Sequence, residues 1–175
     1  SAYQERGRII NIDEFPPFYK LLIISFWAGA SVMVIETVAS RLLARSFGNS
    51  LYTWTGIIGV ELGALSIGGY IGGYLGQHLN PRKVSVFFLF LSSVCTLFIP
   101  LMNTLLPMSP ILWNLSWQMQ ILTHSIIVFG PACLAFGALS PLLVQLIPPN
   151  EHGEVQGKEI GMTYAMNAIG GILGV

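Results

Sequence analysis

Long apolar runs separated by short polar segments dominate the chain. Between Val84 and Asn150 there are 67 consecutive residues without Asp, Glu, Lys or Arg, whereas about 20 apolar residues suffice for one helix to cross a bilayer. Lipid cannot hydrogen-bond exposed backbone groups, so such runs must be helical. The pattern predicts an all-α polytopic transmembrane bundle with five spans, at about residues 21–43, 51–76, 84–102, 118–147 and 161–175 onward.

The two ends of the chain differ from the middle. Residues 1–20 carry six charged side chains, and we expect them to form an aqueous arm ahead of a transmembrane domain at 21–175. The fifth run, from Gly161, would form a helix of roughly 22 Å, shorter than the roughly 30 Å hydrocarbon layer. We therefore expect this span to be incomplete and to belong to a longer protein or to half of a larger bundle.

Composition supports a membrane protein. Charged residues make up 9% of the chain, against about 25% in a typical soluble domain. Eight basic and eight acidic side chains cancel, so no basic surface is available for nucleic acid. Cys95 and Cys133 lie in apolar runs without the spacing of a disulfide framework or zinc site. We expect both to be small core residues.

The distribution of Lys and Arg predicts an orientation. Six basic residues fall on one side of the predicted spans and two on the other, and basic residues accumulate on the cytoplasmic side. The N-terminus is therefore expected in the cytoplasm of a cell or cytoplasmic membrane. The six are Arg6, Arg8, Lys20, Arg82, Lys83 and Lys158, and the two are Arg41 and Arg45.

Glycines are concentrated in the second run. Their small-xxx-small spacing removes side chains from one helix face and lets another helix approach closely. We expect this face to pack against a neighbouring helix. No strand precedes the glycines, so they do not indicate a nucleotide-binding turn. The residues concerned are Gly59, Gly63, Gly68, Gly69, Gly72, Gly73 and Gly76.

Two carboxylates lie inside the predicted spans. Glu36 and Glu61 stand 12 residues before and 13 residues after Gly48, so a hairpin about this turn would place them at similar depth. A buried intramembrane acid indicates a proton or cation site. The alternative is structural: Arg41 or Arg45 neutralises Glu36, Glu36 hydrogen-bonds to a neighbouring helix, or Glu61 takes up a proton on burial.

The fourth run adds three residues of interest. His124 could join an intramembrane polar site, although a lone histidine is more often a hydrogen-bonded packing residue. Pro131 and Pro141 interrupt the helical hydrogen bonds, as in the discontinuous helices of transporters. Proline also produces simple kinks in membrane helices. Both readings, a hinge and a static kink, remain open.

Five segments together resemble a known family. They are residues 36–43 (ETVASRLL), 47–50 (FGNS) with Trp54, 62–73 (LGALSIGGYIGG), 137–143 (GALSPLL) and 161–174 (GMTYAMNAIGGILG). In this order they resemble the N-terminal transmembrane domain of spermidine synthase-like (polyamine aminopropyltransferase-like) membrane proteins. The resemblance covers about residues 21–175. It implies a bundle loosely similar to a major-facilitator-type transporter, which in many members precedes a soluble catalytic domain.

The resemblance implies a membrane domain that anchors the protein and passes small cationic or lipidic molecules. Catalysis would lie in a C-terminal domain outside this sequence, and no catalytic motif, metal site or cofactor site is predicted here. A bound lipid is compatible with this class. One alternative is a non-catalytic accessory subunit that contacts other transmembrane subunits. The other is a proton- or cation-coupled transporter that uses Glu36 and Glu61.

Overall fold

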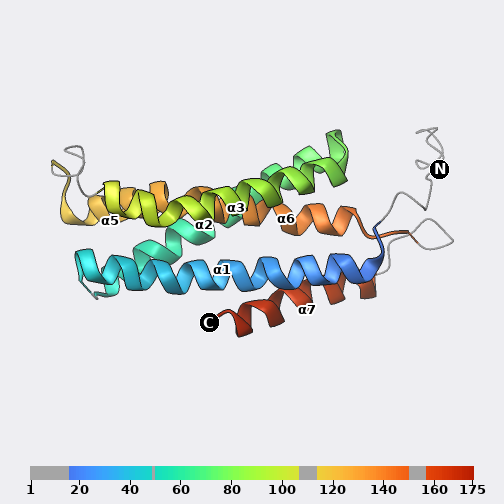
Figure 1. Cartoon of the computed structure of the whole chain (residues 1–175), viewed down its shortest axis with the longest axis horizontal. Helices are drawn as coiled ribbons and strands as arrows, with labels where there is room; N and C mark the ends of the chain where they lie inside the picture. The colour runs from blue at the N-terminus through green and yellow to red at the C-terminus, as the bar shows by residue number, and fades with distance from the viewer. Residues whose placement is uncertain (1–15, 49, 107–113, 150–156) are drawn as a thin grey trace.

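The computed structural model describes residues 16–48, 50–106, 114–149 and 157–175, and every regular element in these ranges is an α-helix (Figure 1). The first 15 residues of the expected aqueous arm lie outside the described residues. The helices are α1 (Phe18–Phe47), α2 (Leu51–His78), α3 (Pro81–Leu105), α5 (Trp117–Val128), α6 (Gly130–Gln145) and α7 (Gly157–Leu173).

The long helices form two layers that share one long axis. Figure 1 shows α1 with α7 below, α3 with α5 and α6 above, and α2 crossing between them. Helices α1, α3 and α7 run in one direction, and α2 and the α5–α6 pair run in the other. The closest packing is between α2 and α6, between α1 and α7, and between α3 and α6.

Short polar segments define where helices begin. The Ser50 hydroxyl accepts a hydrogen bond from the Thr53 amide and caps α2. The Asn80 side chain accepts one from the Arg82 amide, and Pro81 occupies the first turn of α3. Gly48, which follows α1, has a φ of 83°, a conformation that L side chains rarely adopt. Gly48 therefore ends α1, and Ser50 starts the next helix.

Three helices are long and apolar enough to cross a membrane: α1, α2 and α3. The fourth expected span, 118–147, is a bent pair rather than one straight helix, with an angle of 53° between α5 and α6. Counting this pair as one span gives four among the described residues, so the expectation of five spans is not met. Helix α7 has 17 residues and measures roughly 25 Å, which is shorter than the hydrocarbon layer.

Glycines explain why α2 and α6 approach so closely. Gly68, Gly72 and Gly76 are buried and recur every four residues on one face of α2. A Cβ at Gly68 would overlap the backbone of Leu134, and one at Gly72 would overlap the backbone of Ala138. The two backbones are therefore in direct contact, as small-residue stripes permit in membrane helices.

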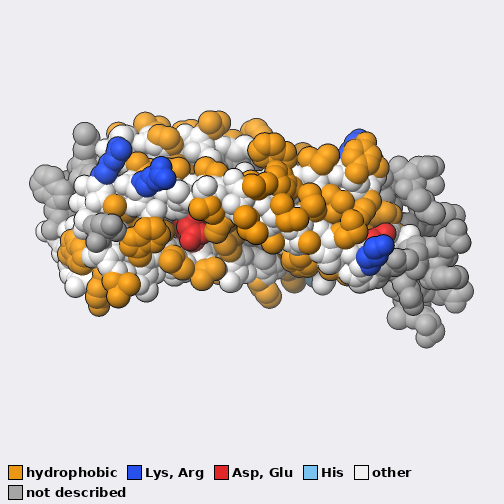
Figure 2. Space-filling model, turned by 90° about the horizontal axis from the view of Figure 1, so that it is seen from below, with side chains coloured by type: hydrophobic (Ala, Val, Ile, Leu, Met, Phe, Trp, Pro, Cys, Tyr) orange, Lys and Arg blue, Asp and Glu red, His pale blue; other side chains and the backbone are white. Residues whose placement is uncertain are grey.

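The outer surface is strongly apolar. Trp27, Tyr70 and Phe90 are 64%, 77% and 68% exposed on three different helices. Figure 2 shows hydrophobic side chains spread over most of the face seen from below, with few charged groups between its ends. Large exposed apolar areas are rare on soluble monomers. This surface is compatible with a protein embedded in lipid.

Candidate functional site

Glu36 and Glu61 lie near the middle of the bundle at similar depth. Glu36 is 11 residues before the end of α1, and Glu61 is 10 residues after the start of α2. At 1.5 Å per residue, both are roughly 15 Å from the end of the bundle where α1 and α2 are joined. Ile35, the neighbour of Glu36, and Ile57, one turn before Glu61, belong to one apolar cluster, so the hairpin brings these parts of α1 and α2 together.

Glu61 is enclosed by the core. It is 4% exposed, and its Oε1 atom has no hydrogen-bond partner among the described residues. Ile57 and Leu65, one turn before and one turn after it on α2, both belong to the apolar cluster between α1, α2, α3, α5 and α6. A buried carboxylate without a partner is costly, so this position is not explained by packing alone.

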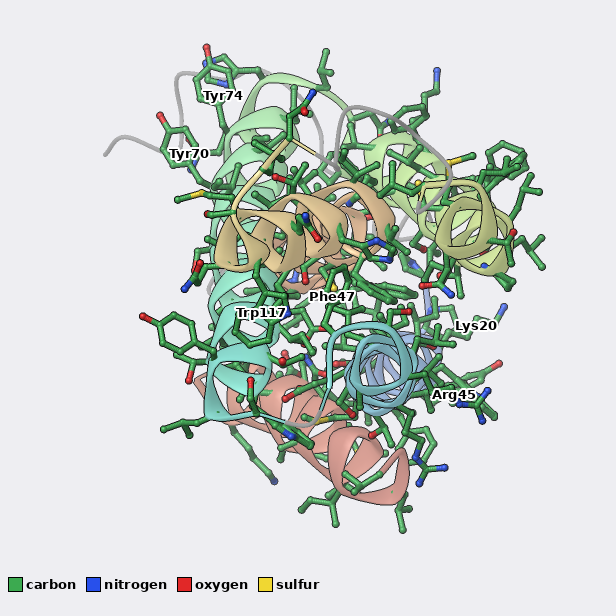
Figure 3. All side chains as sticks on the ribbon, turned by 90° about the vertical axis from the view of Figure 1, so that its left-hand side faces the viewer. Lys20, Arg45, Phe47, Tyr70, Tyr74 and Trp117 are labelled. Carbon is green, nitrogen blue, oxygen red and sulfur yellow. The ribbon has the colours of Figure 1, made fainter. Side chains whose placement is uncertain are left out.

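Glu36 is half-buried, and the basic residues that could neutralise it point elsewhere. Arg41 and Arg45 are exposed on α1, and Figure 3 shows Lys20 and Arg45 directed away from the bundle. Within the described ranges neither carboxylate forms an ion pair. The structure therefore does not contain the salt bridge between Glu36 and Arg41 or Arg45 that one reading of the sequence predicts.

Cys133 is a third member of this cluster, and sequence reasoning assigned it only to the core. Its side chain is fully buried at the start of α6. It packs in the same apolar cluster as Ile35, the neighbour of Glu36, and Ile57, one turn before Glu61. Its position two residues after Pro131, next to the bend between α5 and α6, is the signal in the sequence that could have drawn attention to it. The cluster thus joins α1, α2 and α6.

A cleft of about 910 Å³ lies between α1, α2, α6 and α7. Helix α7 packs mainly on α1, and Ser25 Oγ of α1 donates a hydrogen bond of 2.8 Å to the Thr163 carbonyl of α7. The cleft lies where α7 stands away from α2. Most of its lining is apolar or glycine, and its polar side chains include Ser140 of α6 and Tyr164 and Asn167 of α7.

The cleft leads toward the acidic pair. On α1 its lining residues form a stripe that ends at Val32 and Met33, and Glu36 is the next residue of this stripe. On α2 the lining begins at Leu65, one turn after Glu61. Since side chains three and four residues apart share a helix face, both acids lie one turn beyond the same end of the cleft, outside its lining.

The lining residues of α6 end at the same level of the bundle as those of α1 and α2. On α6 the lining residues nearest the acidic pair are Phe136 and Gly137, one turn after Cys133. Because α6 runs parallel to α2 and antiparallel to α1, all three stripes extrapolate toward the same level of the bundle. Glu36, Glu61 and Cys133 therefore each lie about one turn beyond this end of the cleft, and none of them lines it.

His124 lies in a separate polar contact. It is 1% exposed on α5, and its Nε2 atom is 3.0 Å from Asn103 Oδ1 of α3. The Phe47 ring packs edge-on against the imidazole with centroids 5.7 Å apart, and Figure 3 shows Phe47 inside the bundle. The histidine Nδ1 atom and the nearby Ser125 Oγ are buried without a described partner. The structure does not join His124 directly to the two carboxylates.

The remaining sequence candidates have different environments. Gly69 and Gly73 make ordinary contacts with α6, whereas a Cβ at Gly59 or Gly63 would meet nothing within 4 Å. The expected packing role therefore does not extend to Gly59 and Gly63 among the described residues. Pro131 stands in the first turn of α6 beside the 53° bend.

Pro141 does not interrupt its helix. It lies inside α6, which continues to Gln145. The side-chain Nε2 of Gln145 donates a hydrogen bond of 3.2 Å to the Gly73 carbonyl. This bond holds the end of α6 against α2. Pro141 itself contributes to the wall of the cleft. A hinge at either proline stays a prediction, since the bend beside Pro131 is a fixed angle in this structure.

Comparison with protein-family models, with curated proteins and with solved structures finds no match for this chain. The resemblance to spermidine synthase-like membrane proteins thus rests on the sequence motifs alone, and the similarity to a major-facilitator-type bundle is not supported. Among the described residues, no group of three or more His, Cys, Asp or Glu side chains could hold a metal ion.

Proposed function

We propose that this chain is the membrane-embedded domain of a spermidine synthase-like protein and that it holds a small organic cation in the cleft beside Glu36 and Glu61. The observation that carries the proposal is a pair of carboxylates without an ion pair among the described residues, each one helical turn beyond the lining of a cleft of about 910 Å³. Any aminopropyl-transfer chemistry would belong to a soluble domain outside this sequence.

The chemistry of the cleft favours an ammonium ion with an aliphatic chain. Its volume lies within the range of about 300–1,000 Å³ that is usual for small-molecule sites. Two close carboxylates repel each other, and a cation between them removes this repulsion. The apolar walls suit methylene groups, and Ser140, Tyr164 and Asn167 supply hydrogen-bonding groups. A linear diamine such as putrescine has both features.

The distribution of charge along the bundle supports a cytoplasmic N-terminus. Lys20, Arg82 and Lys158 stand in the first turns of α1, α3 and α7, which begin at the same end of the bundle (Figure 1). Arg41 and Arg45 stand near the opposite end. We place the basic end in the cytoplasm of a cell membrane, because positive residues are retained on that side.

Putrescine binding to the purified chain in lipid nanodiscs, measured by calorimetry, tests the proposal. We expect saturable binding that weakens at least about tenfold in the Glu36→Gln, Glu61→Gln double variant, which corresponds to about 1.4 kcal/mol. The control is Glu159→Gln, which removes an acid from the first turn of α7 and should bind as the unaltered chain does. A diol of equal length should not compete. Equal affinities in all variants would refute the proposal.

A second candidate function is cation-coupled transport. It is favoured by the bent α5–α6 pair beside the acidic cluster, since broken helices form the ion and substrate sites of many transporters. Putrescine uptake into proteoliposomes tests it. We expect uptake by the unaltered chain and less than a tenth of this rate with the double variant. Binding without any uptake would restrict the domain to holding its ligand.

A further inference from the structure

Pro141 leaves one backbone carbonyl of α6 without its usual partner. In an α-helix the amide of each residue donates a hydrogen bond to the carbonyl four residues earlier, but proline has no amide hydrogen. Pro141 lies inside α6, which continues past it to Gln145. The carbonyl of Gly137, four residues before Pro141, therefore lacks its regular helical donor.

This carbonyl belongs to the wall of the cleft. Gly137 and Pro141 both line the cleft, and Gly137 has no side chain, so it presents its backbone there. Gly69 of α2 is also in the lining, and a Cβ at Gly69 would lie 3.7 Å from the Gly137 carbonyl oxygen. An unpaired backbone group inside a membrane is tolerated where it lines a cavity. The Gly137 oxygen is therefore placed to accept a hydrogen bond from a molecule in the cleft.

Three side chains of the lining add further hydrogen-bonding groups. They are Ser140 of α6 and Tyr164 and Asn167 of α7, and none of them forms a side-chain hydrogen bond with another described residue. Ser140 is one turn after Gly137, so the two residues share a face of α6. The cleft thus combines a carbonyl, two hydroxyls and an amide with walls that are otherwise mostly apolar.

The charge that this lining accepts follows from its composition. The described lining contains no Lys, Arg or His and no Asp or Glu, so its polarity comes from neutral dipoles. The Gly137 oxygen carries a partial negative charge, which stabilises a cation and repels an anion. Hydrogen bonds from a charged donor are also about twice as strong as those between neutral groups. A cation that carries N–H groups therefore fits this wall best.

We propose that the Gly137 carbonyl, freed by Pro141, accepts a hydrogen bond from an N–H group of the bound cation, so that the cleft selects primary over quaternary ammonium ions. This inference deepens the proposed function and rests on it, because a cation must occupy the cleft. A quaternary ammonium ion has the same charge but no N–H group, so it leaves the carbonyl unpaired. Size does not separate the two classes, because a cleft of about 910 Å³ holds either.

Calorimetry on the chain in lipid nanodiscs, with butylammonium and butyltrimethylammonium as ligands, tests this selection. We expect the unaltered chain to bind butylammonium at least about tenfold more tightly, because only this ion can donate to the carbonyl. Pro141→Ala supplies the missing amide hydrogen and returns the Gly137 carbonyl to the helix. This variant should bind butylammonium at least about tenfold more weakly and butyltrimethylammonium within about twofold of the unaltered chain. Pro131→Ala is the matched control and should change neither affinity, since Ile127, four residues before Pro131, does not line the cleft.

Hydrogen exchange measured by mass spectrometry supplies a readout that does not depend on a ligand. The new amide at position 141 in Pro141→Ala should be protected from exchange, because it bonds to the Gly137 carbonyl. Unprotected exchange at this position would overturn the inference.

The binding results separate this inference from the proposed function. Equal affinity of the unaltered chain for both cations would overturn the inference and leave the proposed function standing. The same holds if Pro141→Ala weakened both cations alike or did not weaken butylammonium. If butylammonium did not bind, the inference would fall, and the putrescine titration would decide the proposed function by itself.

Discussion

Replacing Gly72 by Ala tests the direct contact between α2 and α6. A Cβ at this position would lie 2.7 Å from the Ala138 Cα and would overlap the Ala138 carbonyl oxygen. Ordinary contact for such atoms begins near 3.4 Å, so the helices must separate by roughly 1 Å, and a gap of this size already forfeits a quarter to a half of the dispersion attraction across it.

The size of the effect follows from two opposing contributions. Alanine stabilises a helix relative to glycine by about 0.5–1 kcal/mol, whereas overpacking a tight contact costs about 1–3 kcal/mol. We expect Gly72→Ala to lower the free energy of unfolding by about 1–2 kcal/mol. Gly59→Ala is the matched control: a Cβ there meets nothing within 4 Å, so it should leave stability unchanged or raise it by up to about 1 kcal/mol.

Unfolding in mixed micelles, followed by circular dichroism as SDS is increased, measures both variants. Adding Gly68→Ala to Gly72→Ala should cost less than the sum of the two single changes, because one separation of the helices relieves both overlaps. If Gly72→Ala were as stable as Gly59→Ala, α2 and α6 would not be in backbone contact, and the position of the acidic cluster between them would have to be revised.

Three further changes test contacts that hold other helices in place. Ser25→Ala removes the hydrogen bond to the Thr163 carbonyl and should lower the free energy of unfolding by about 1 kcal/mol. Proteolysis of α7 should become faster. An unchanged rate of proteolysis would contradict this contact between α1 and α7. His124→Ala removes the contact with Asn103 and should lower stability by about 2–3 kcal/mol through the lost hydrogen bond and the cavity left behind in the same SDS titration. Ser50→Ala removes the N-cap of α2 and should lower the free energy of unfolding by about 1 kcal/mol. The helical signal at moderate SDS should therefore fall. If it stayed at the level of the unaltered chain, the cap would be refuted.

Hydropathy alone predicts most of the helices, because lipid-length apolar runs have no other stable form. The expected start of α1 at Leu21 differs from Phe18 in the structure by one turn, since aromatic residues at an interface can belong to either side. The bend between α5 and α6 is not visible in hydropathy. Pro131 marks its position, but its angle depends on packing against α2 and α3.

The candidate site is only partly contained in the sequence. The nearly equal spacing of Glu36 and Glu61 from Gly48, 12 and 13 residues, predicts their similar depth, because a hairpin of two helices has one register. The cleft and the approach of Cys133 depend on where α6 and α7 settle, which no local pattern encodes. Likewise, the glycine repeat predicts a packing face but cannot tell that Gly59 and Gly63 lie outside it.

Accessibility of mid-helix positions tests the central claim, that lipid surrounds this bundle and the two acids lie inside it. Single cysteines at Val34, Leu62 and Phe90, which are all exposed in the structure, would be introduced after replacement of the two native cysteines by alanine, with Lys83→Cys as the aqueous control. In liposomes we expect the three mid-helix positions to resist a water-soluble maleimide while the control reacts. Spin labels at the same three positions should be broadened by oxygen dissolved in the lipid. Reaction of the mid-helix cysteines as fast as the control would contradict the account.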